Sequence, residues 1–233
     1  MEDSFNSIND NLLQHNDYKE NHDLENLCNL KIRNTIGQIC DAHIFHGRSL
    51  EYVSEITNSW KHYMYDTIDR IEFTNETELI EEISSLPFHD FHWEWGKKYN
   101  YYNSKEYDWF YFVINNKVEA ISFCSSPKRS VIDSENIFYI EYIAVAPWNR
   151  NHKLIDRHFK GLGYILIKEI SKYFHTCKNY RFGFSLSAVP QAINFYQQIG
   201  MIYFGQYNHD GLYFYEMNFE NAKKLIEEDA NDK

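Results

Sequence analysis

Apolar and polar residues recur along this chain in patterns that predict a sheet covered by helices. Segment 30–34 alternates apolar and polar residues and segment 39–45 is strand-like, so one of them is expected to open the sheet. Ser49 suits a helix N-cap, and apolar residues at helical spacing follow it as far as Met64. A shorter helix is predicted next, and Pro87 ends it.

Strands and helices alternate in the second half of the chain. Runs 109–114 and 118–124 flank Asn-Asn-Lys and predict a β-hairpin. Run 137–145 is a strongly apolar strand with one embedded acid, Glu141. The elements expected after it are a helix opening at Gly161, a strand over 182–186, a short helix over 190–199, strands over 201–204 and 212–217, and a last amphipathic helix. This order predicts an α/β fold (α+β mixed) around one central sheet.

Composition and charge separate a folded body from its ends. Hydrophobic residues make up 43% of the 233 residues, which is enough for a packed core. The net charge is −11, and residues 1–29 carry −6 of it. We interpret 1–26 as a flexible acidic tail, 27–228 as one domain and 229–233 as a short C-terminal tail.

Several functional classes are disfavoured by these features. No apolar run approaches the roughly 20 residues of a membrane-spanning helix, and the acidic N-terminus does not resemble a secretory signal. The body has no basic stripe to bind a phosphate backbone. Four scattered cysteines without a C-x-x-C motif fit a reducing cytoplasm. We therefore expect a cytoplasmic protein with no membrane, nucleic-acid or metal partner, and we leave a homodimer open.

Two stretches carry candidate chemistry. After the strand 137–145, a polar loop leads into Gly161-Leu162-Gly163 at a helix start. Helix N-termini present unpaired N–H groups that bind phosphate, and glycines let a diphosphate approach the backbone. Further along, a short helix containing Ala192 and Tyr196 is stopped by Gly200. Taken alone, Tyr196 is equally explained as packing between helix and sheet.

The two stretches together resemble the GNAT superfamily of N-acetyltransferases, over about residues 109–217. That family has a [Gln/Arg]-x-x-Gly-x-[Gly/Ala] motif and later an Ala-x-x-x-Tyr motif with a following glycine. The matching residues here are His158-Phe159-Lys160-Gly161-Leu162-Gly163, Ala192-Ile193-Asn194-Phe195-Tyr196 and Gly200-Met201. The chain departs from the pattern at His158, with Arg157 one residue early, at Val189 in place of a frequent Asn, and in a long loop, 148–160.

The resemblance implies a GNAT-like acyl-CoA N-acyltransferase fold: a mostly antiparallel sheet with a splayed parallel pair, flanked by helices. It implies an acceptor-side part over about 27–108 and an acetyl-CoA-binding core over about 109–217. Pantetheine would pair with the central strand and the diphosphate would lie on the amides from Phe159 to Tyr164. The cofactor-binding residues so implied are Ile143, Ala144, Val145, Arg157, His158, Phe159, Lys160, Gly161, Leu162, Gly163 and Tyr164.

The resemblance also implies catalytic roles. Tyr196 would protonate the leaving thiolate, and Glu141 is a candidate base for the attacking amine. The alternative for Glu141 is a strand residue paired with a nearby Lys or Arg. No covalent enzyme intermediate is required, because direct transfer in a ternary complex suffices.

The acceptor side is less defined. Trp93, Glu94, Trp95 and Trp148 are candidates for an aromatic, acidic wall that suits an amine, with core packing as the alternative. His89 and His92 are better explained as surface residues than as metal ligands, and His209-Asp210 as a turn. We expect an acetyl-CoA-dependent N-acetyltransferase, with aminoglycoside, polyamine, peptide N-terminal and lysine acceptors open. The alternative is a non-catalytic acyl-CoA-binding sensor or interaction module.

Overall fold

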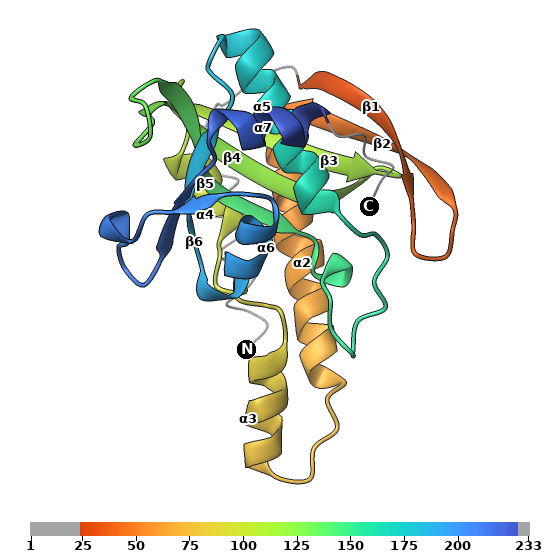
Figure 1. Cartoon of the computed structure of the whole chain (residues 1–233). Helices are drawn as coiled ribbons and strands as arrows, with labels where there is room; N and C mark the ends of the chain where they lie inside the picture. The colour runs from red at the N-terminus through yellow and green to blue at the C-terminus, as the bar shows by residue number, and fades with distance from the viewer. Residues whose placement is uncertain (1–23, 228–233) are drawn as a thin grey trace.

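The computed structural model describes residues 24–227, in which eight strands form one sheet in the order β1-β2-β3-β4-β5-β6-β8-β7 (Figure 1). Neighbouring strands are antiparallel except β5 and β6, which are parallel. The strands are β1 (Glu25–Arg33), β2 (Ile39–His46), β3 (Tyr107–Ile114), β4 (Lys117–Arg129), β5 (Asn136–Val145), β6 (Phe184–Ala188), β7 (Ile202–Tyr203) and β8 (Tyr213–Glu216). The predicted mixed, mostly antiparallel sheet with one parallel pair is confirmed.

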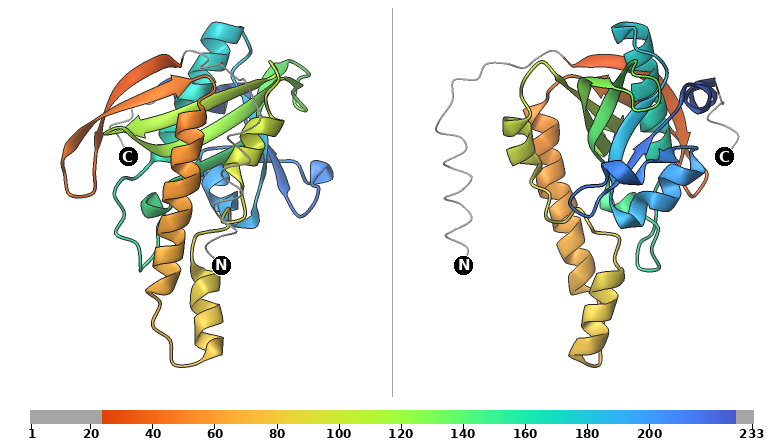
Figure 2. Two further views of the ribbon diagram at one scale, coloured as in Figure 1. Left: turned by 180° about the vertical axis from the view of Figure 1, so that it is seen from behind. Right: turned by 60° about the vertical axis from the view of Figure 1, so that its left-hand side comes forward.

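Helices cover both faces of the sheet. α5, α6 and α7 pack on one face and α2 and α4 on the other, while α3 extends away from the body (Figures 1 and 2). The helices are α2 (Leu50–Asp69), α3 (Glu76–Ser85), α4 (Trp95–Tyr101), α5 (Leu162–Lys178), α6 (Ile193–Gln198) and α7 (Phe219–Glu227), with short 3-10 turns η1 (Pro147–Asn149), η2 (Pro190–Ala192) and η3 (Gly205–Tyr207).

Side chains of the central strands point alternately to the two faces of the sheet and contribute to two separate hydrophobic cores. Phe138 of β5 points to the α5 side, where its ring stacks on Phe174 at 4.2 Å between centroids. Tyr142 of the same strand points to the opposite side and stacks on Phe123 of β4. Because successive strand residues face opposite sides, both faces of β5 are apolar and the strand sits between two helical layers.

The first helices follow their local sequence signals. The Ser49 hydroxyl accepts a hydrogen bond from the Tyr52 amide and caps α2, whose buried stripe includes Trp60 and Met64. Asn75 caps α3 in the same way, although α3 buries none of its residues. The charged, peripheral α3 is therefore held mainly by its ends and by contacts from a later loop.

Some expectations need adjustment. Segment 88–108 appears irregular in the sequence, yet it contains α4, because Trp95 is drawn into the core. Segment 125–127, whose Ser-Ser-Pro sequence indicates a turn or a bulge, lies inside β4 as a bulge, with a register shift between Ser125 and Lys128. Residues 1–23 of the proposed N-terminal tail and all of the proposed C-terminal tail, 229–233, lie outside the described residues, but Glu25, within the proposed 1–26 tail, belongs to β1 and pairs with His46 of β2. Among the helices of residues 24–227, none combines the length and hydrophobicity needed to span a bilayer.

Candidate active site

Strands β5 and β6 separate partway along their length. Their parallel pairing covers only three residue pairs and ends at Ile140 and Leu186, after which β6 pairs with β8 alone. From Glu141 to Val145 every residue of β5 is half-buried, in contrast to Ile137, Phe138 and Ile140, which are buried. The edge of β5 beyond Ile140 is therefore open to an extended ligand.

The backbone of this open edge presents hydrogen-bonding groups. The Ala146 N–H donates to the Glu119 carbonyl of β4 at 2.8 Å. Bonded and non-bonded positions alternate in an antiparallel pair, so the N–H and C=O groups of Ile143 and Val145 point away from β4. The Arg150 guanidinium donates two hydrogen bonds to the Val145 carbonyl, from Nε at 3.0 Å and from Nη2 at 2.8 Å. Ile143 and the Val145 N–H remain to pair with a ligand, whereas Ala144 faces β4.

The glycine turn at the start of α5 lies next to the end of β5. Gly161 is the N-cap in a left-handed conformation (φ +74°), which favours glycine, and a Cβ built there would meet nothing within 4 Å. A Cβ on Gly163 would lie 3.7 Å from Val145 Cγ1, so the turn and the strand edge are adjacent. The turn is therefore an open helix N-terminus beside the strand edge, of the kind that binds phosphate groups.

Not every amide of the predicted phosphate loop is available. The Phe159 N–H donates to Asn149 Oδ1 at 3.0 Å, and Phe159 itself is buried. The first hydrogen bond of α5 runs from the Ile165 N–H to the Gly161 carbonyl, which leaves the Leu162 and Gly163 amides without an acceptor inside the helix. The backbone amides that remain for a ligand therefore begin after Phe159, and the exposed Lys160 lies next to them in the chain.

Arg157 and His158 make hydrogen bonds that hold the loop before this turn in place. The Arg157 guanidinium donates to the Phe159 carbonyl at 3.1 Å, while the Thr35 N–H donates to the His158 carbonyl at 2.9 Å. His158 also lines a cavity of about 320 Å³ beside the β1–β2 turn, together with Glu119. Both residues connect the loop to the β1–β2 turn, because the Thr35 hydroxyl also donates to the Arg157 carbonyl at 2.5 Å.

The long loop before α5 is fixed to the body rather than free. Arg150 makes a two-pronged ion pair with Asp90, with Nη2 to Oδ2 at 2.7 Å, and both side chains are about 90% buried. Lys153 pairs with Glu82 of α3. These contacts join the loop to the segment that precedes α4, on the acceptor side of the sheet.

Glu141 lies at the closed end of the gap, where the strands meet. Phe123 pairs with Tyr142 and Cys124 with Ile140, so Glu141 is the extra residue of a β-bulge. Its Oε1 accepts a hydrogen bond from the Ser125 hydroxyl at 2.5 Å. Within residues 24–227 the carboxylate thus pairs with a hydroxyl and with no Lys or Arg.

Tyr196 packs in the buried cluster that contains Ile140 and Leu186, the last paired residues before the gap. Its side chain is buried beside Phe195 and Tyr215. Burial, with a smaller effect from Tyr139, raises the pKa of the Tyr196 phenol well above its usual value. The phenol therefore keeps its proton at neutral pH, which suits a donor.

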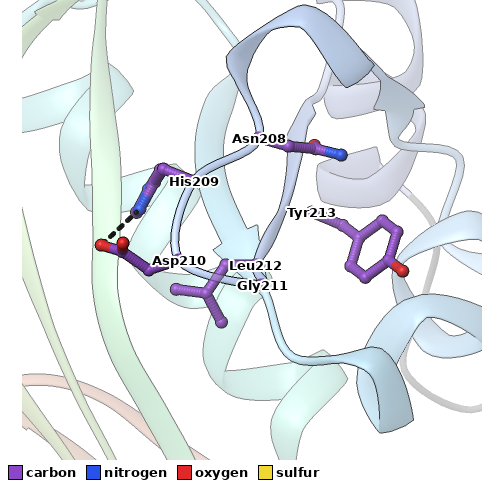
Figure 3. A pocket seen from close by; sticks show the side chains of 6 residues that line it. All are labelled: Asn208, His209, Asp210, Gly211, Leu212 and Tyr213. Carbon is purple, nitrogen blue, oxygen red and sulfur yellow. Dashed lines mark ion pairs between the residues drawn. The ribbon is translucent and has the colours of Figure 1, made fainter.

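A chain of polar side chains leads from this region to the surface. Burial raises the pKa of Tyr139, although contacts with Ser187 oppose the rise. The Ser187 hydroxyl lies 3.0 Å from His209 Nε2, and His209 Nδ1 lies 3.6 Å from Asp210 Oδ2. Figure 3 shows His209 and Asp210 facing each other at the rim of a cavity of about 270 Å³ in the loop between β7 and β8. The sequence suggested only a turn here.

Aromatic rings form a wall on the α4 side of Glu141. Trp93 meets the Tyr142 ring edge-on at 4.7 Å, and Lys98 Nζ lies 3.4 Å from the centre of the Tyr142 ring. Tyr102 stands beside them, and burial, together with Tyr142 and Glu141, raises its pKa to about 12. The wall combines rings, phenols and one ammonium group next to the bulge.

The structure divides the four predicted acceptor residues. Trp93 belongs to this aromatic wall. Glu94 is exposed and pairs with Lys97 at 2.7 Å. Trp95 is 4% exposed and packs against Trp60, while Trp148 donates its indole N–H to buried Glu119 at 2.7 Å. Trp95 and Trp148 therefore pack in the core, which is the alternative that the sequence left open.

Sequence reasoning missed several polar residues near the gap. Ser125, Ser187 and His209 come from three distant segments, and only the sheet order brings them to one face. Alternation in β6 was the one available signal, because Ser185 and Ser187 share a face of the strand. Lys98 gave no signal, since α4 itself was not predicted.

Known proteins resemble this chain in structure rather than in sequence. No protein-family model matches the chain, and no curated protein is significantly similar to it. Among solved structures, the PaiA N-acetyltransferase from Thermoplasma acidophilum in complex with coenzyme A is 12% identical, with a TM-score of 0.47 over 76% of this chain and 99% of its own.

Two further solved structures are similar. The N-acetyltransferase PseH from Campylobacter jejuni is 12% identical, with a TM-score of 0.39 over 75% of this chain and 97% of its own. The GNAT domain of S. lividans PAT is 11% identical, with a TM-score of 0.43 over 81% and 96%. With TM-scores below 0.5, these likenesses leave any functional proposal to this chain's own residues. Solved N-acetyltransferases of the GNAT family are thus among the structures that this chain resembles.

Proposed function

We propose that this protein is an acetyl-CoA-dependent N-acetyltransferase of the GNAT type, which transfers an acetyl group directly to an amine in a ternary complex. The observation that carries the proposal is the open edge of β5 ending beside the glycine turn of α5. One element offers strand-like pairing to a pantetheine arm, and the other offers a cradle for its diphosphate. The first family-like motif, His158 to Gly163, falls on this glycine turn, and the second, which contains Tyr196, falls on η2 and α6.

Each end of the gap has its own task in this proposal. Lys160 and the amides from Gly161 to Gly163 hold the diphosphate. The Ile143 backbone and the Val145 N–H orient the arm, which therefore runs from Val145 towards Glu141. The bound thioester supplies an activated acetyl group and a thiolate leaving group. The reacting carbon is expected near the bulge, within reach of the acceptor face.

Two side chains manage protons there. Glu141, directly or through a water, accepts a proton from the acceptor ammonium so that the nitrogen lone pair can attack. Tyr196, protonated because burial raises its pKa, donates to the departing thiolate. His209, connected to Ser187 and Asp210, is a second residue able to carry the acceptor's proton to solvent.

The remaining features are compatible with a cytoplasmic enzyme. All four cysteines are free thiols in the described structure, as a reducing compartment requires. The proposal assigns acetyl-CoA and an amine as its partners, and needs neither metal nor nucleic acid.

The test has two steps on the full-length protein. Acetyl-CoA binding is measured by calorimetry, and then CoA release is followed with a mixed library of amines. Binding with amine-dependent CoA release supports the transferase. Binding without release for any amine favours the acyl-CoA-binding sensor, and no binding removes both.

A further inference from the structure

Lys98 is an unusual lysine for its position. It lies on α4, half-buried, and its ammonium sits over the Tyr142 ring at 3.4 Å and at 5.5 Å from the centre of the Trp93 ring. Within residues 24–227, no carboxylate lies within ion-pair distance of its Nζ. Neighbouring Lys97 differs, since it is exposed and paired with Glu94 at 2.7 Å.

The place that Lys98 occupies is the place an acceptor amine needs. Tyr142 follows Glu141 directly at the bulge, and both belong to the sheet face that carries Tyr102 and Ser125. Under the proposed function, the acetyl group ends at this bulge. The protein thus holds one of its own primary amines against the wall that borders the acetyl group and its candidate base.

The geometry points to Lys98 as an internal acceptor: the protein acetylates the Lys98 amine in its own active site. This inference rests on the proposed function. A proton passes from the Lys98 ammonium to Glu141, directly or through a water. The Nζ lone pair then attacks the thioester carbon, a C–N bond forms and the C–S bond breaks. The thiolate leaves with the proton of Tyr196, and the second proton of the attacking nitrogen passes through water to restore the Tyr196 phenol, giving N-acetyl-Lys98 and CoA.

Acetylation would change the wall as well as the lysine. The neutral amide loses the cation–π attraction to Tyr142 and Trp93. The side chain is then free to leave the rings, and a second amine can take its place. The modification would therefore mark the first turnover of the protein and open the wall to an external acceptor.

Mass spectrometry of the full-length protein tests the chemistry. After incubation with acetyl-CoA alone, we expect one acetyl group on Lys98 at least tenfold faster than on Lys97. Since the transfer is intramolecular, its rate should not depend on protein concentration. Lys98→Arg should remove the modification, and Glu141→Gln should slow it at least tenfold. Non-enzymatic acetylation would instead be faster at the exposed Lys97, and its rate would be the same in wild type and in Glu141→Gln.

A second readout needs no acetyl-CoA. Lysines are converted to ¹³C-dimethyl-lysines, which keep their charge, and their methyl signals are recorded by NMR. Ring current should shift the Lys98 methyls upfield relative to Lys97, and Tyr142→Leu should remove the shift. An unshifted Lys98 signal, or acetylation equal at both lysines, overturns the inference. Acetyl-CoA binding with transfer to a free amine, but none to Lys98, overturns it while sparing the proposed function; absence of binding overturns both.

Discussion

Identical chemical groups behave differently at different places around the gap. The Tyr196 and Tyr102 phenols both have raised pKa values, mainly because of burial, but their titratable neighbours differ. For Tyr196 the pKa is raised by burial and, to a smaller extent, by Tyr139. Tyr102 has, besides burial, the neighbouring Glu141 and Tyr142. Both stay protonated at neutral pH, yet only Tyr196 comes from the helix that follows β6.

The role of Tyr196 is tested by removing its hydroxyl. We expect Tyr196→Phe to lower kcat about 10²-fold, since positioned acid catalysis typically contributes 10²–10⁴-fold. Acetyl-CoA affinity should change little, because the ring remains in the same packed cluster. Steady-state kinetics and calorimetry check the two quantities. Equal turnover in variant and wild type would remove Tyr196 from the mechanism.

The two candidates for proton acceptance are separated by paired substitutions. Glu141→Gln keeps an oxygen for the Ser125 hydroxyl but cannot accept a proton, so kcat should fall about 10²-fold. His209→Gln lies farther along the polar chain and should reduce kcat less than tenfold. The kcat values of the two variants are measured by CoA release with an amine that the wild type acetylates. The reverse order would assign the base to His209.

Two loops, more than any helix, decide how the candidate site is built. The turn at Gly161 sets a positive φ at the mouth of α5, and the loop that follows η1 is fixed by Arg150 to the segment before α4. One loop makes the cradle and the other ties the cradle to the acceptor side.

The cradle is tested by adding one methyl group. Gly161→Ala forces a side chain into the left-handed region, at a cost of roughly 1–2 kcal/mol, and places its Cβ where no protein atom lies. We expect acetyl-CoA affinity to fall at least tenfold by calorimetry. Gly37→Ala is a matched control, with φ +90° and equally open space. If both variants lose affinity alike, backbone strain and not the cradle is responsible.

The anchored loop gives a stability prediction. Asp90→Ala leaves the buried Arg150 guanidinium without its carboxylate and should lower the free energy of unfolding by about 3 kcal/mol. Glu82→Ala removes the more exposed pair with Lys153 on the same loop and should cost about 1 kcal/mol or less. Urea unfolding measures both. Similar costs would mean that the Arg150 pair is not the anchor.

For the molecule as a whole, a buried carboxylate ties the sheet to α5. Asp108 of β3 contacts His46 of β2 at 2.9 Å, Tyr173 of α5 at 3.2 Å and Lys178 at 3.4 Å. Burial by itself would raise the pKa of Asp108, but hydrogen bonding with His46 and the charge of Lys178 outweigh it and lower the pKa. Because the native pKa is the lower one, the ionised form stabilises the fold.

This stabilisation should depend on pH in a defined direction. It is fully present above the unfolded pKa of about 3.9 and is lost as the pH falls through the lower native value. Asp108→Asn should therefore destabilise the protein at pH 7, and the difference from wild type should shrink on acidification below about pH 4. Asp41→Asn, at an exposed pair, is the control and should show little effect. The free energies of unfolding of wild type and both variants are measured by urea titration at several pH values.

Local pattern accounts for most of the elements. Ser49 and Asn75 cap the predicted helices, Asn115 and Asn116 adopt the positive φ of a tight hairpin turn, and the apolar run ending at Val145 is the central strand. α4 was missed because tertiary burial of Trp95, not local periodicity, selects a helix in that segment. Short polar segments with mixed aromatic residues have no period that favours one state.

The amino-acid order was enough for the glycine turn, the apolar strand before it and the tyrosine on the later short helix, because each depends on neighbours in the chain. Tertiary structure alone set the gap between β5 and β6 and the hydrogen bond from the Ser125 hydroxyl to Glu141. It also set the polar chain to His209 and the position of the Lys98 ammonium over the Tyr142 ring. Each of these joins segments far apart in sequence, and contacts of that kind exist only once strand order, the β-bulge and packing on both faces have fixed which side chains meet.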